Sequence, residues 1–286
     1  MKRVGLVLCG GGAKGAYQVG VFKALEELGI AEQVKAISGS SIGAINGALF
    51  LQYSADEIEQ IWKSCNWPSV FGVSKENGQR LNQVIQSVNT RKMPAVFGIM
   101  NLMGVANTTG LPLKRDAFEK MLKRYIDFSK ISQQDIDLVV SCGKLNTKQM
   151  RYFNLTQVSP TLGKDILLAS TAVPVIFNPV YLDDGYYCDP MQIERAPLRP
   201  LLESHCETII IVYLSRRQRL NVNQINGKQI IEIVPRMEMG TGIYGSLDFR
   251  LNKIESCVDL GSDDAYRILY NAMRKNPKPP RYVKLT

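Results

Sequence analysis

One serine of this chain lies between two glycines at a spacing that is typical of an exposed nucleophile. Residues 39–43 read Gly-Ser-Ser-Ile-Gly and follow the apolar stretch 34–38. In a G-x-S-x-G turn between a strand and a helix, the small flanking residues permit a strained backbone that presents the central serine. The pattern therefore predicts that Ser41 is a nucleophile.

A second glycine-rich turn precedes this serine. Residues 10–15 read Gly-Gly-Gly-Ala-Lys-Gly and follow the apolar run 4–9. Glycine-rich turns between a strand and a helix can hold backbone N–H groups toward a negative charge. A presented serine together with such an anion cradle is the minimum equipment for acyl transfer. The two turns predict a serine hydrolase.

The composition indicates a folded protein with an excess of positive charge. Of 286 residues, 45% are hydrophobic and 21% are charged, which argues against disorder. The net charge is +9, and modest basic clusters occur at 216–219 and 274–284. This excess favours anionic partners such as a membrane surface, although dispersed charge is equally typical of a solvated face. No nucleic-acid-binding module is recognisable, so we expect no nucleic-acid partner.

The cysteines and the N-terminus indicate where the protein resides. Six scattered cysteines without C-x-x-C pairs favour a reducing compartment over a disulfide scaffold or zinc site. The start of the chain imitates a lipoprotein signal that ends at Cys9, but residues 4–8 are too few for its apolar region and predict a buried strand instead. We expect a cytoplasmic protein that associates peripherally with membranes. Export as an effector by a route without a cleavable signal remains an alternative.

Apolar periodicity predicts a single α/β domain over residues 1–286, because buried strands alternate with helices as in a mostly parallel sheet covered on both faces. The pattern dissolves into Pro, Gly and Asn between residues 67 and 114, which predicts an irregular segment. The predicted strands are 3–9, 34–38, 136–142, 149–155, 208–214 and 230–234, with a hairpin at 179–188. The predicted helices are 16–28, 42–52, 55–64, 115–126, 162–170 and 255–274.

Three segments, in this order, resemble the patatin-like phospholipases. They are the glycine turn 10–15, the Gly-Ser-Ser-Ile-Gly-Ala-Ile-Asn stretch at 39–46, and the Ala-Ser-Thr-Ala-Val-Pro-Val-Ile-Phe-Asn-Pro-Val stretch at 169–180. Residues 247–249 and 259–265 are similar to the last helix of that family and its approach. The resemblance implies a three-layer α/β/α sandwich with a mostly parallel central sheet. It also implies hydrolysis of acyl esters of glycerolipids by a Ser-Asp dyad, without metal or cofactor.

The resemblance assigns roles to single residues. Ser41 matches the nucleophile, and the aspartate position falls on Asp189, although Pro190 and Met191 stand where the family carries glycines. This departure leaves open whether Asp189 is held another way or the site is slow or inactive. Asp184 is the alternative base, but its Asp-Gly pair suits a hairpin turn. The residues that match the oxyanion loop are Gly10, Gly11, Gly12 and Ala13.

A histidine triad is the alternative to the dyad. His205 is the sole histidine, and Ser41, Asp189 and His205 follow the chain order of α/β-hydrolases. A lone histidine between a helix and a strand is more often a surface or capping residue. We therefore expect Asp189 itself to accept the Ser41 proton.

Further residues are candidates for contact with a membrane phospholipid or lysophospholipid substrate. Lys14 is placed to contact a lipid phosphate, or alternatively braces the loop by an ion pair or cap, while the helix that begins at about Gly15 supplies its positive end. Uncharged residues 93–113, flanked by basic pairs, suit an acyl-chain groove or interfacial lid, or simply complete the core. The lid residues predicted to bind substrate are Phe97, Met100 and Met103.

Other functions would explain part of the pattern. A thioesterase or acyltransferase would use the same residues, and a non-catalytic lipid-binding protein would explain the missing glycines after Asp189. A dinucleotide-binding module would require an acidic residue about 20 positions after the glycine turn. The chain carries serines there, which disfavours that module. The oligomeric state is left open.

Overall fold

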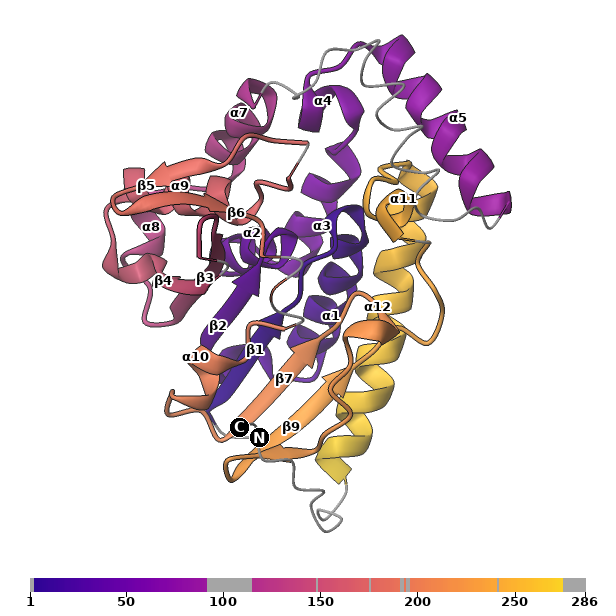
Figure 1. Ribbon diagram of the computed structural model, residues 1–286. Coiled ribbons are helices and arrows are strands. Elements are labelled where there is room, and N and C mark those ends of the chain that lie inside the picture. Colours follow the sequence, from indigo (N-terminus) through magenta and orange to yellow (C-terminus); the bar gives the residue numbers. More distant parts are fainter. Residues whose placement is uncertain are drawn as a thin grey trace.

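The computed structural model describes residues 3–91, 115–147, 149–174, 176–190, 193, 196–240 and 242–274. These residues form a nine-stranded mixed sheet with the order β5-β6-β3-β2-β1-β7-β9-β8, and β4 pairs with β3 beside this path (Figure 1). The strands are β1 Val4–Leu8, β2 Val34–Ser40, β3 Asp137–Lys144, β4 Gln149–Asn154, β5 Val180–Leu182, β6 Gly185–Cys188, β7 Thr208–Val212, β8 Gln224–Ile225 and β9 Lys228–Ile233.

The centre of the sheet is parallel and its margins are antiparallel. β1 lies between β2 and β7, and both pairs are parallel, as are β2 with β3 and β7 with β9. The hairpin of β5 and β6, the strand β4 and the strand β8 pair in antiparallel fashion. All five residues of β1 are buried, as expected for a strand covered on both faces. The carboxyl ends of five parallel strands therefore meet at one edge of the sheet.

Alternate residues of the central strands face two different cores. Leu6 of β1 and Ile210 of β7 belong to the larger core, which the long helices cover. Val7 and Ile211 belong to a smaller core that includes Leu201, from the short helix on the opposite face. Helices thus lie on both faces of the sheet. The helices are α1 Ala16–Glu27, α2 Ile42–Phe50, α3 Ala55–Ser64, α4 Trp67–Phe71, α5 Lys75–Arg91, α7 Asp116–Tyr125, α8 Phe128–Ile131, α9 Pro160–Ser170, α10 Arg199–Leu202, α11 Gly242–Ser246 and α12 Leu251–Arg274.

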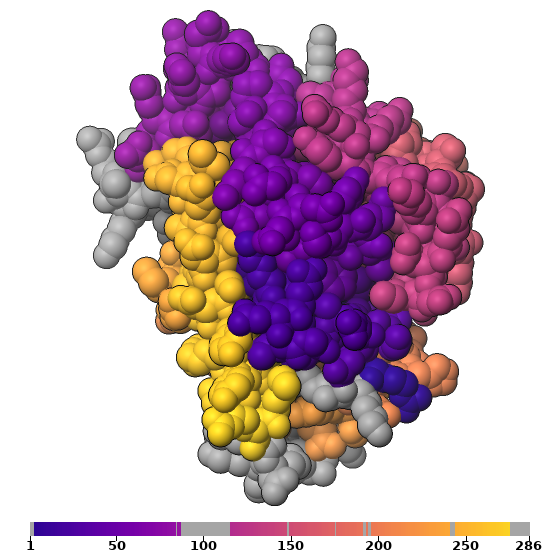
Figure 2. Space-filling view, turned by 180° about the vertical axis from the view of Figure 1, so that it is seen from behind, coloured from indigo at the N-terminus to yellow at the C-terminus, as the bar shows by residue number. Residues whose placement is uncertain are grey.

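The last helix packs against the first. α12 runs along α1 on the face with the larger core, and from behind it is seen as a yellow column beside the N-terminal helices (Figure 2). Tyr17 of α1 donates a hydrogen bond to the buried carboxylate of Asp264 in α12 at 3.1 Å. No helix in the described ranges combines the length and the apolar character needed to cross a bilayer.

The prediction of an irregular segment from residue 67 onward is wrong for its first part. α4 and α5 occupy residues 67–71 and 75–91. Asn66 caps α4 by accepting a hydrogen bond from the amide of Ser69 at 3.0 Å, and the Trp67 indole donates to Asn82 of α5 at 3.0 Å. α5 is mostly polar, and among its described side chains the buried apolar ones are Leu81 and Ile85. Such a thin apolar stripe gives a weak periodic signal.

Candidate active site

Ser41 stands in a strained turn at the carboxyl end of β2. Its backbone angles are φ 54° and ψ −124°, in a region that side chains rarely adopt, and it occupies the N-cap position of α2. The turn is possible because Gly43 carries no side chain: a Cβ there would overlap the carbonyl oxygen of Leu8 in β1. Ser41 is 8% exposed, so its surroundings are largely closed to solvent. This geometry is that of a nucleophile elbow.

The glycine turn packs directly against this elbow. A Cβ added to Gly10 would lie 3.2 Å from the Cβ of Ser41. Gly12 has a φ of +59°, and a Cβ there would overlap the carbonyl oxygen of Ser246 in α11. From Gly12 the chain continues as a 3₁₀ turn into α1. The first N–H groups of such a helical segment have no intrahelical partner, so they can meet negative charge that develops next to Ser41.

A buried network of amide side chains binds the backbone carbonyls at the two ends of the glycine turn. Gln18 donates to the carbonyl of Cys9 at 2.8 Å, and Asn46 donates to the carbonyl of Gly15 at 3.0 Å. Asn46 also donates to Gln18 at 2.8 Å and accepts from the Trp62 indole at 3.0 Å. Both ends of the turn are therefore fixed by side chains of α1, α2 and α3.

Gln218 holds the turn from the other side. Its Nε2 donates to the carbonyl of Gly10 at 3.2 Å, and its Oε1 accepts from the amide of Leu214 at 3.1 Å. A Cβ at Gly11 would come within 2.8 Å of the Leu214 side chain, so this segment after β7 contacts the turn directly. Gln218 and Leu214 thus connect the segment after β7 to the glycine turn.

Ser41 and Asp189 approach the same edge of β3 from opposite directions, because β4 pairs along the other edge of β3. Ser40 of β2 pairs with Ser141 of β3, and Cys188 of β6 pairs with Gly143. Because β2 runs parallel to β3 and β6 runs antiparallel to it, the next residue of each strand is level with Cys142. Both residues therefore lie about one strand spacing, roughly 5 Å, from the Cys142 backbone and on the same side of it, so Ser41 and Asp189 are neighbours where the ends of β2 and β6 meet. Burial, with the Asp189 carboxylate as the second cause, raises the pKa of the Cys142 thiol well above its usual value.

The environment of Asp189 compensates in part for the missing glycines. Asp189 is only 5% exposed, and its backbone amide donates a hydrogen bond to the carbonyl of Ala172 at 3.0 Å. The proline that follows cannot donate, but this hydrogen bond already fixes the backbone of Asp189 to the end of α9.

The carboxylate of Asp184 is occupied by two hydrogen bonds to neighbouring side chains. It lies at the turn of the β5–β6 hairpin, where one carboxylate oxygen accepts from Lys144 at 2.7 Å and the other from the Tyr187 hydroxyl at 2.7 Å. The hydrogen bond from Lys144, followed by that from Tyr187, lowers the pKa of Asp184. Both oxygens are thus engaged in bracing the hairpin.

His205 lies at the opposite edge of the sheet from Ser41. It precedes β7, whose first residue Thr208 pairs with Val4 at the start of β1. Ser41 follows the carboxyl end of the neighbouring parallel strand β2. A five-residue strand spans roughly 16 Å, so the geometry does not bring the imidazole to the nucleophile.

Lys14 is a buried lysine beside the glycine turn. It is 7% exposed, and burial is the largest cause that lowers its pKa, while the charge of Glu238 acts in the opposite direction. Its aliphatic stem passes over α11, because a Cβ at Gly245 would lie 2.6 Å from the Lys14 Cε. Within the described ranges its ammonium makes no hydrogen bond or ion pair, so it remains available to an anionic ligand.

The other predicted site residues divide into two groups. Gly15 lies in the turn and its carbonyl is held by Asn46. The predicted lid residues Phe97, Met100 and Met103 lie outside the described residues. Over the described part of the chain, no three His, Cys, Asp or Glu side chains are grouped closely enough to hold a metal ion.

The sequence prediction did not identify the supporting residues. These are Ser170, Gln18, Asn46 and Gln218. Asn46 and Ser170 lie inside the motif stretches 39–46 and 169–180, which was the available signal. Gln18 and Gln218 carry no local signal, because their importance depends on contacts with the distant glycine turn.

Comparisons with known proteins bear on the family and the fold of the chain. A family model described as "Patatin-like phospholipase" matches residues 6–196. "Lysophospholipase nte1" of Aspergillus terreus is 30% identical over 194 residues, which are 67% of this chain but 11% of that protein. Among solved structures, human GIVD cytosolic phospholipase A2 has a TM-score of 0.50 at 10% identity, over 95% of this chain and 59% of that one. VipD from Legionella pneumophila has a TM-score of 0.49 at 15% identity, over 95% and 67%.

Proposed function

The chain belongs to the patatin-like phospholipase family, and we propose that it hydrolyses acyl esters of glycerolipids, as a phospholipase A or lysophospholipase. The observation that carries this proposal is the contact between the strained Ser41 and the glycine turn, in which Gly10 lies directly against the serine. This pairs a nucleophile with N–H groups positioned for the oxyanion.

In the proposed mechanism, Ser41 Oγ attacks the acyl carbonyl carbon while Asp189 accepts the serine proton. The carbonyl oxygen becomes an oxyanion that the N–H groups between Gly11 and Ala13 stabilise, with the positive end of α1 behind them. Collapse expels the alcohol or lysolipid, which takes the proton back from Asp189. Water then attacks the acyl-enzyme while Asp189 accepts its proton, and as the bond between the acyl carbon and Ser41 Oγ breaks, Asp189 returns this proton to Ser41 Oγ and the fatty acid leaves.

Lys14 gives the proposed site a means of binding the substrate phosphate. A buried ammonium with no partner in the described ranges favours an anion strongly, because the low dielectric around it strengthens the attraction. The net charge of +9 supports peripheral contact with anionic membranes. Cosedimentation with anionic vesicles that weakens as salt rises would test that contact.

The decisive experiment combines covalent labelling with hydrolysis. A fluorophosphonate probe should label the wild-type protein and not Ser41→Ala, and the same variant should lose hydrolysis of phospholipid and lysophospholipid vesicles. Ser256→Ala is the matched control, because Ser256 is an exposed serine of α12. Equal labelling of wild type and Ser41→Ala would refute the nucleophile. An unlabelled wild-type protein would indicate a non-catalytic lipid-binding protein. Faster turnover of acyl thioesters, or acyl transfer to an added alcohol, would indicate a thioesterase or acyltransferase.

A further inference from the structure

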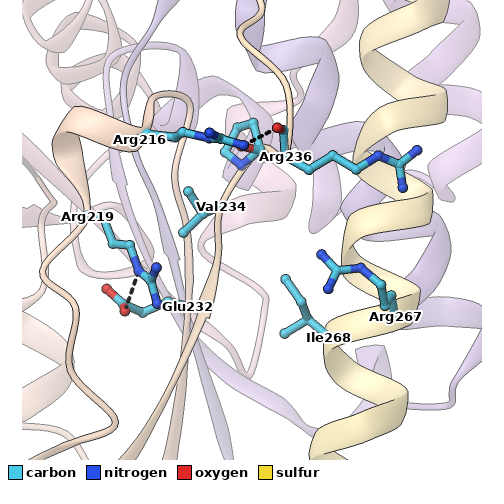
Figure 3. A pocket seen from close by; sticks show the side chains of 8 residues that line it. Arg216, Arg219, Glu232, Val234, Arg236, Arg267 and Ile268 are labelled. Carbon is cyan, nitrogen blue, oxygen red and sulfur yellow. Dashed lines mark hydrogen bonds and ion pairs between the residues drawn. The ribbon is translucent and has the colours of Figure 1, made fainter.

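Four arginines line a cleft of about 580 Å³ next to the segment that holds the glycine turn. Arg216 and Arg219 come from the turn after β7, Arg236 follows β9, and Arg267 belongs to α12. Figure 3 shows the Arg267 side chain leaving α12 toward β9, with Arg216 and Arg219 on the other side of the cleft. The cleft therefore opens at the same carboxyl edge of the sheet as Ser41.

Most of the guanidinium donors in this cleft are unused. A guanidinium carries five N–H donors. Arg216 donates two hydrogen bonds, one to the carbonyl of Pro235 and one to the carbonyl of Arg236. Arg219 makes one hydrogen bond, to Glu232 at 3.1 Å, and Arg267 reaches only Asp264, at 3.7 Å. Within the part of the chain that the structure describes, none of these side chains makes more than two hydrogen bonds.

Positive charge exceeds negative charge along the walls. Among the described residues, Glu232 is the one carboxylate that lines the cleft with the four arginines. Asp263 lines the adjoining hollow and binds Arg236 at 2.8 Å, and the fully buried Asp264 accepts from the Arg236 amide at 2.9 Å. Arg219, Arg236 and Arg267 each have a carboxylate partner, whereas Arg216 has none among the described residues. Guanidinium groups match phosphate oxygens in two-pronged geometry, so phosphate is the anion that this wall suits.

The cleft is connected to the proposed catalytic centre by a short segment. Arg216 lies two residues before Gln218, and Gln218 Nε2 donates to the carbonyl of Gly10. An anion that immobilises Arg216 would therefore also restrict Gln218, which binds the glycine turn.

We propose that this cleft is a second anion site, separate from the proposed lipid acyl site, and that it binds a ligand carrying doubly charged phosphate groups. The ligand is either a soluble phosphate compound or the phosphomonoester headgroup of a membrane lipid. Its recognition rests on Arg216 and Arg267, which face each other across the cleft, with Arg219 and Arg236 adding charge.

The test measures binding and does not depend on hydrolysis. Pyrophosphate is titrated into the full chain by calorimetry at low ionic strength, for wild type, Arg267→Gln and Arg267→Glu. Arg199→Gln is the control, because Arg199 is an exposed arginine of α10 that pairs only with Glu203. Wild type should bind one pyrophosphate saturably, Arg267→Gln should bind roughly tenfold more weakly because one charged donor group is lost, and Arg267→Glu should not bind. Thermal melts check that all variants are folded.

A second arm separates the two sources of phosphate. Vesicles of ether-linked phosphatidylcholine, with or without ether-linked phosphatidic acid, contain no acyl ester and cannot be hydrolysed. Binding to the phosphatidic acid vesicles that falls in Arg267→Glu and is displaced by pyrophosphate identifies a lipid headgroup. Pyrophosphate binding without this vesicle effect identifies a soluble ligand. Absence of saturable pyrophosphate binding, or an equal loss in Arg199→Gln, overturns the proposal whether or not the protein is a hydrolase.

Discussion

The backbone amide of Ser41 donates a hydrogen bond to Ser170 Oγ at 2.9 Å, and that hydroxyl donates in turn to the carbonyl of Ser141 at 2.8 Å. Two residues further on, the carbonyl of Ala172 accepts the amide of Asp189. The end of α9 therefore binds the backbones of both residues of the proposed dyad. This helix end thus holds the two residues together, in addition to the pairing of β2 and β6 with β3.

Ser170→Ala should lower kcat by about tenfold and change KM little. The substitution leaves the Ser41 amide and the Ser141 carbonyl without their partner in a buried place, which costs about 1–3 kcal/mol and releases the elbow from α9. Steady-state hydrolysis and a thermal melt measure the two effects. The control is Ser159→Ala at the other end of α9, where the serine caps the helix. It should lower the melting temperature while kcat stays within twofold. If both variants lower kcat equally, the Ser170 contact only stabilises the helix.

Asp189→Asn should reduce hydrolysis by roughly 10²–10⁴, the range expected for loss of a positioned base, because an amide cannot accept the Ser41 proton. The buried position and the hydrogen bond to Ala172 should keep the fold intact. Asp184→Asn is the matched control, since its carboxylate braces an exposed hairpin through Lys144. We expect a small loss of stability there and nearly full activity. The reverse pattern would identify Asp184 as the base.

Lys14 should make binding of phosphate-bearing substrates depend on pH below the ordinary lysine range. Burial lowers its pKa from the usual 10.5, and the ammonium is charged only below its pKa. KM for a lysophospholipid should therefore rise as pH increases toward 10.5, and KM for a monoacylglycerol should not. Lys14→Met should raise the lysophospholipid KM at pH values below the Lys14 pKa, where wild type carries the ammonium, and should abolish the dependence of this KM on pH. A monoacylglycerol KM that rises in parallel would exclude a phosphate contact.

Gly12→Ala should destabilise the protein by several kcal/mol and abolish hydrolysis. The new Cβ would overlap the Ser246 carbonyl, and the positive φ adds roughly 1–2 kcal/mol. Gly29 separates the two causes, because its φ is +63° and a Cβ there would meet nothing within 4 Å. Gly29→Ala should lower the free energy of unfolding only by the amount due to the positive φ, and it should leave activity unchanged. Chemical denaturation measures the free energy of unfolding of both variants. Equal losses of stability would show that the overlap with the Ser246 carbonyl is relieved at no cost in free energy.

The sequence predicted those parts of the fold whose signal is local. The apolar runs of β1 and β7 and the turns at residues 10–15 and 39–43 are contiguous, so the central strands and the elbow were placed correctly. The predicted α/β/α arrangement, with a parallel centre of the sheet and helices on both faces, was also confirmed, while the margins of the sheet are antiparallel. α5 was missed because its apolar stripe is thin, and Ser170 was missed because its role arises from residues far away in the chain. The roles of Ser41 and Asp189 remain predictions.

The order of the strands has a consequence for the synthesis of this protein. β1 is made first but lies between β2 and β7, and the glycine turn that follows it is closed by Ser246. An emerging chain must therefore keep an apolar first strand unpaired on one side until residues 208–212 have left the ribosome. Pairing between strands that are far apart in the sequence slows folding. Meanwhile, it leaves an apolar, unpaired strand edge exposed to aggregation with other chains. A fragment that ends at residue 196, the limit of the family match, would lack β7, β9 and α12. We expect it to aggregate, so the unit that can fold extends well beyond residue 196, where the match to the family model ends.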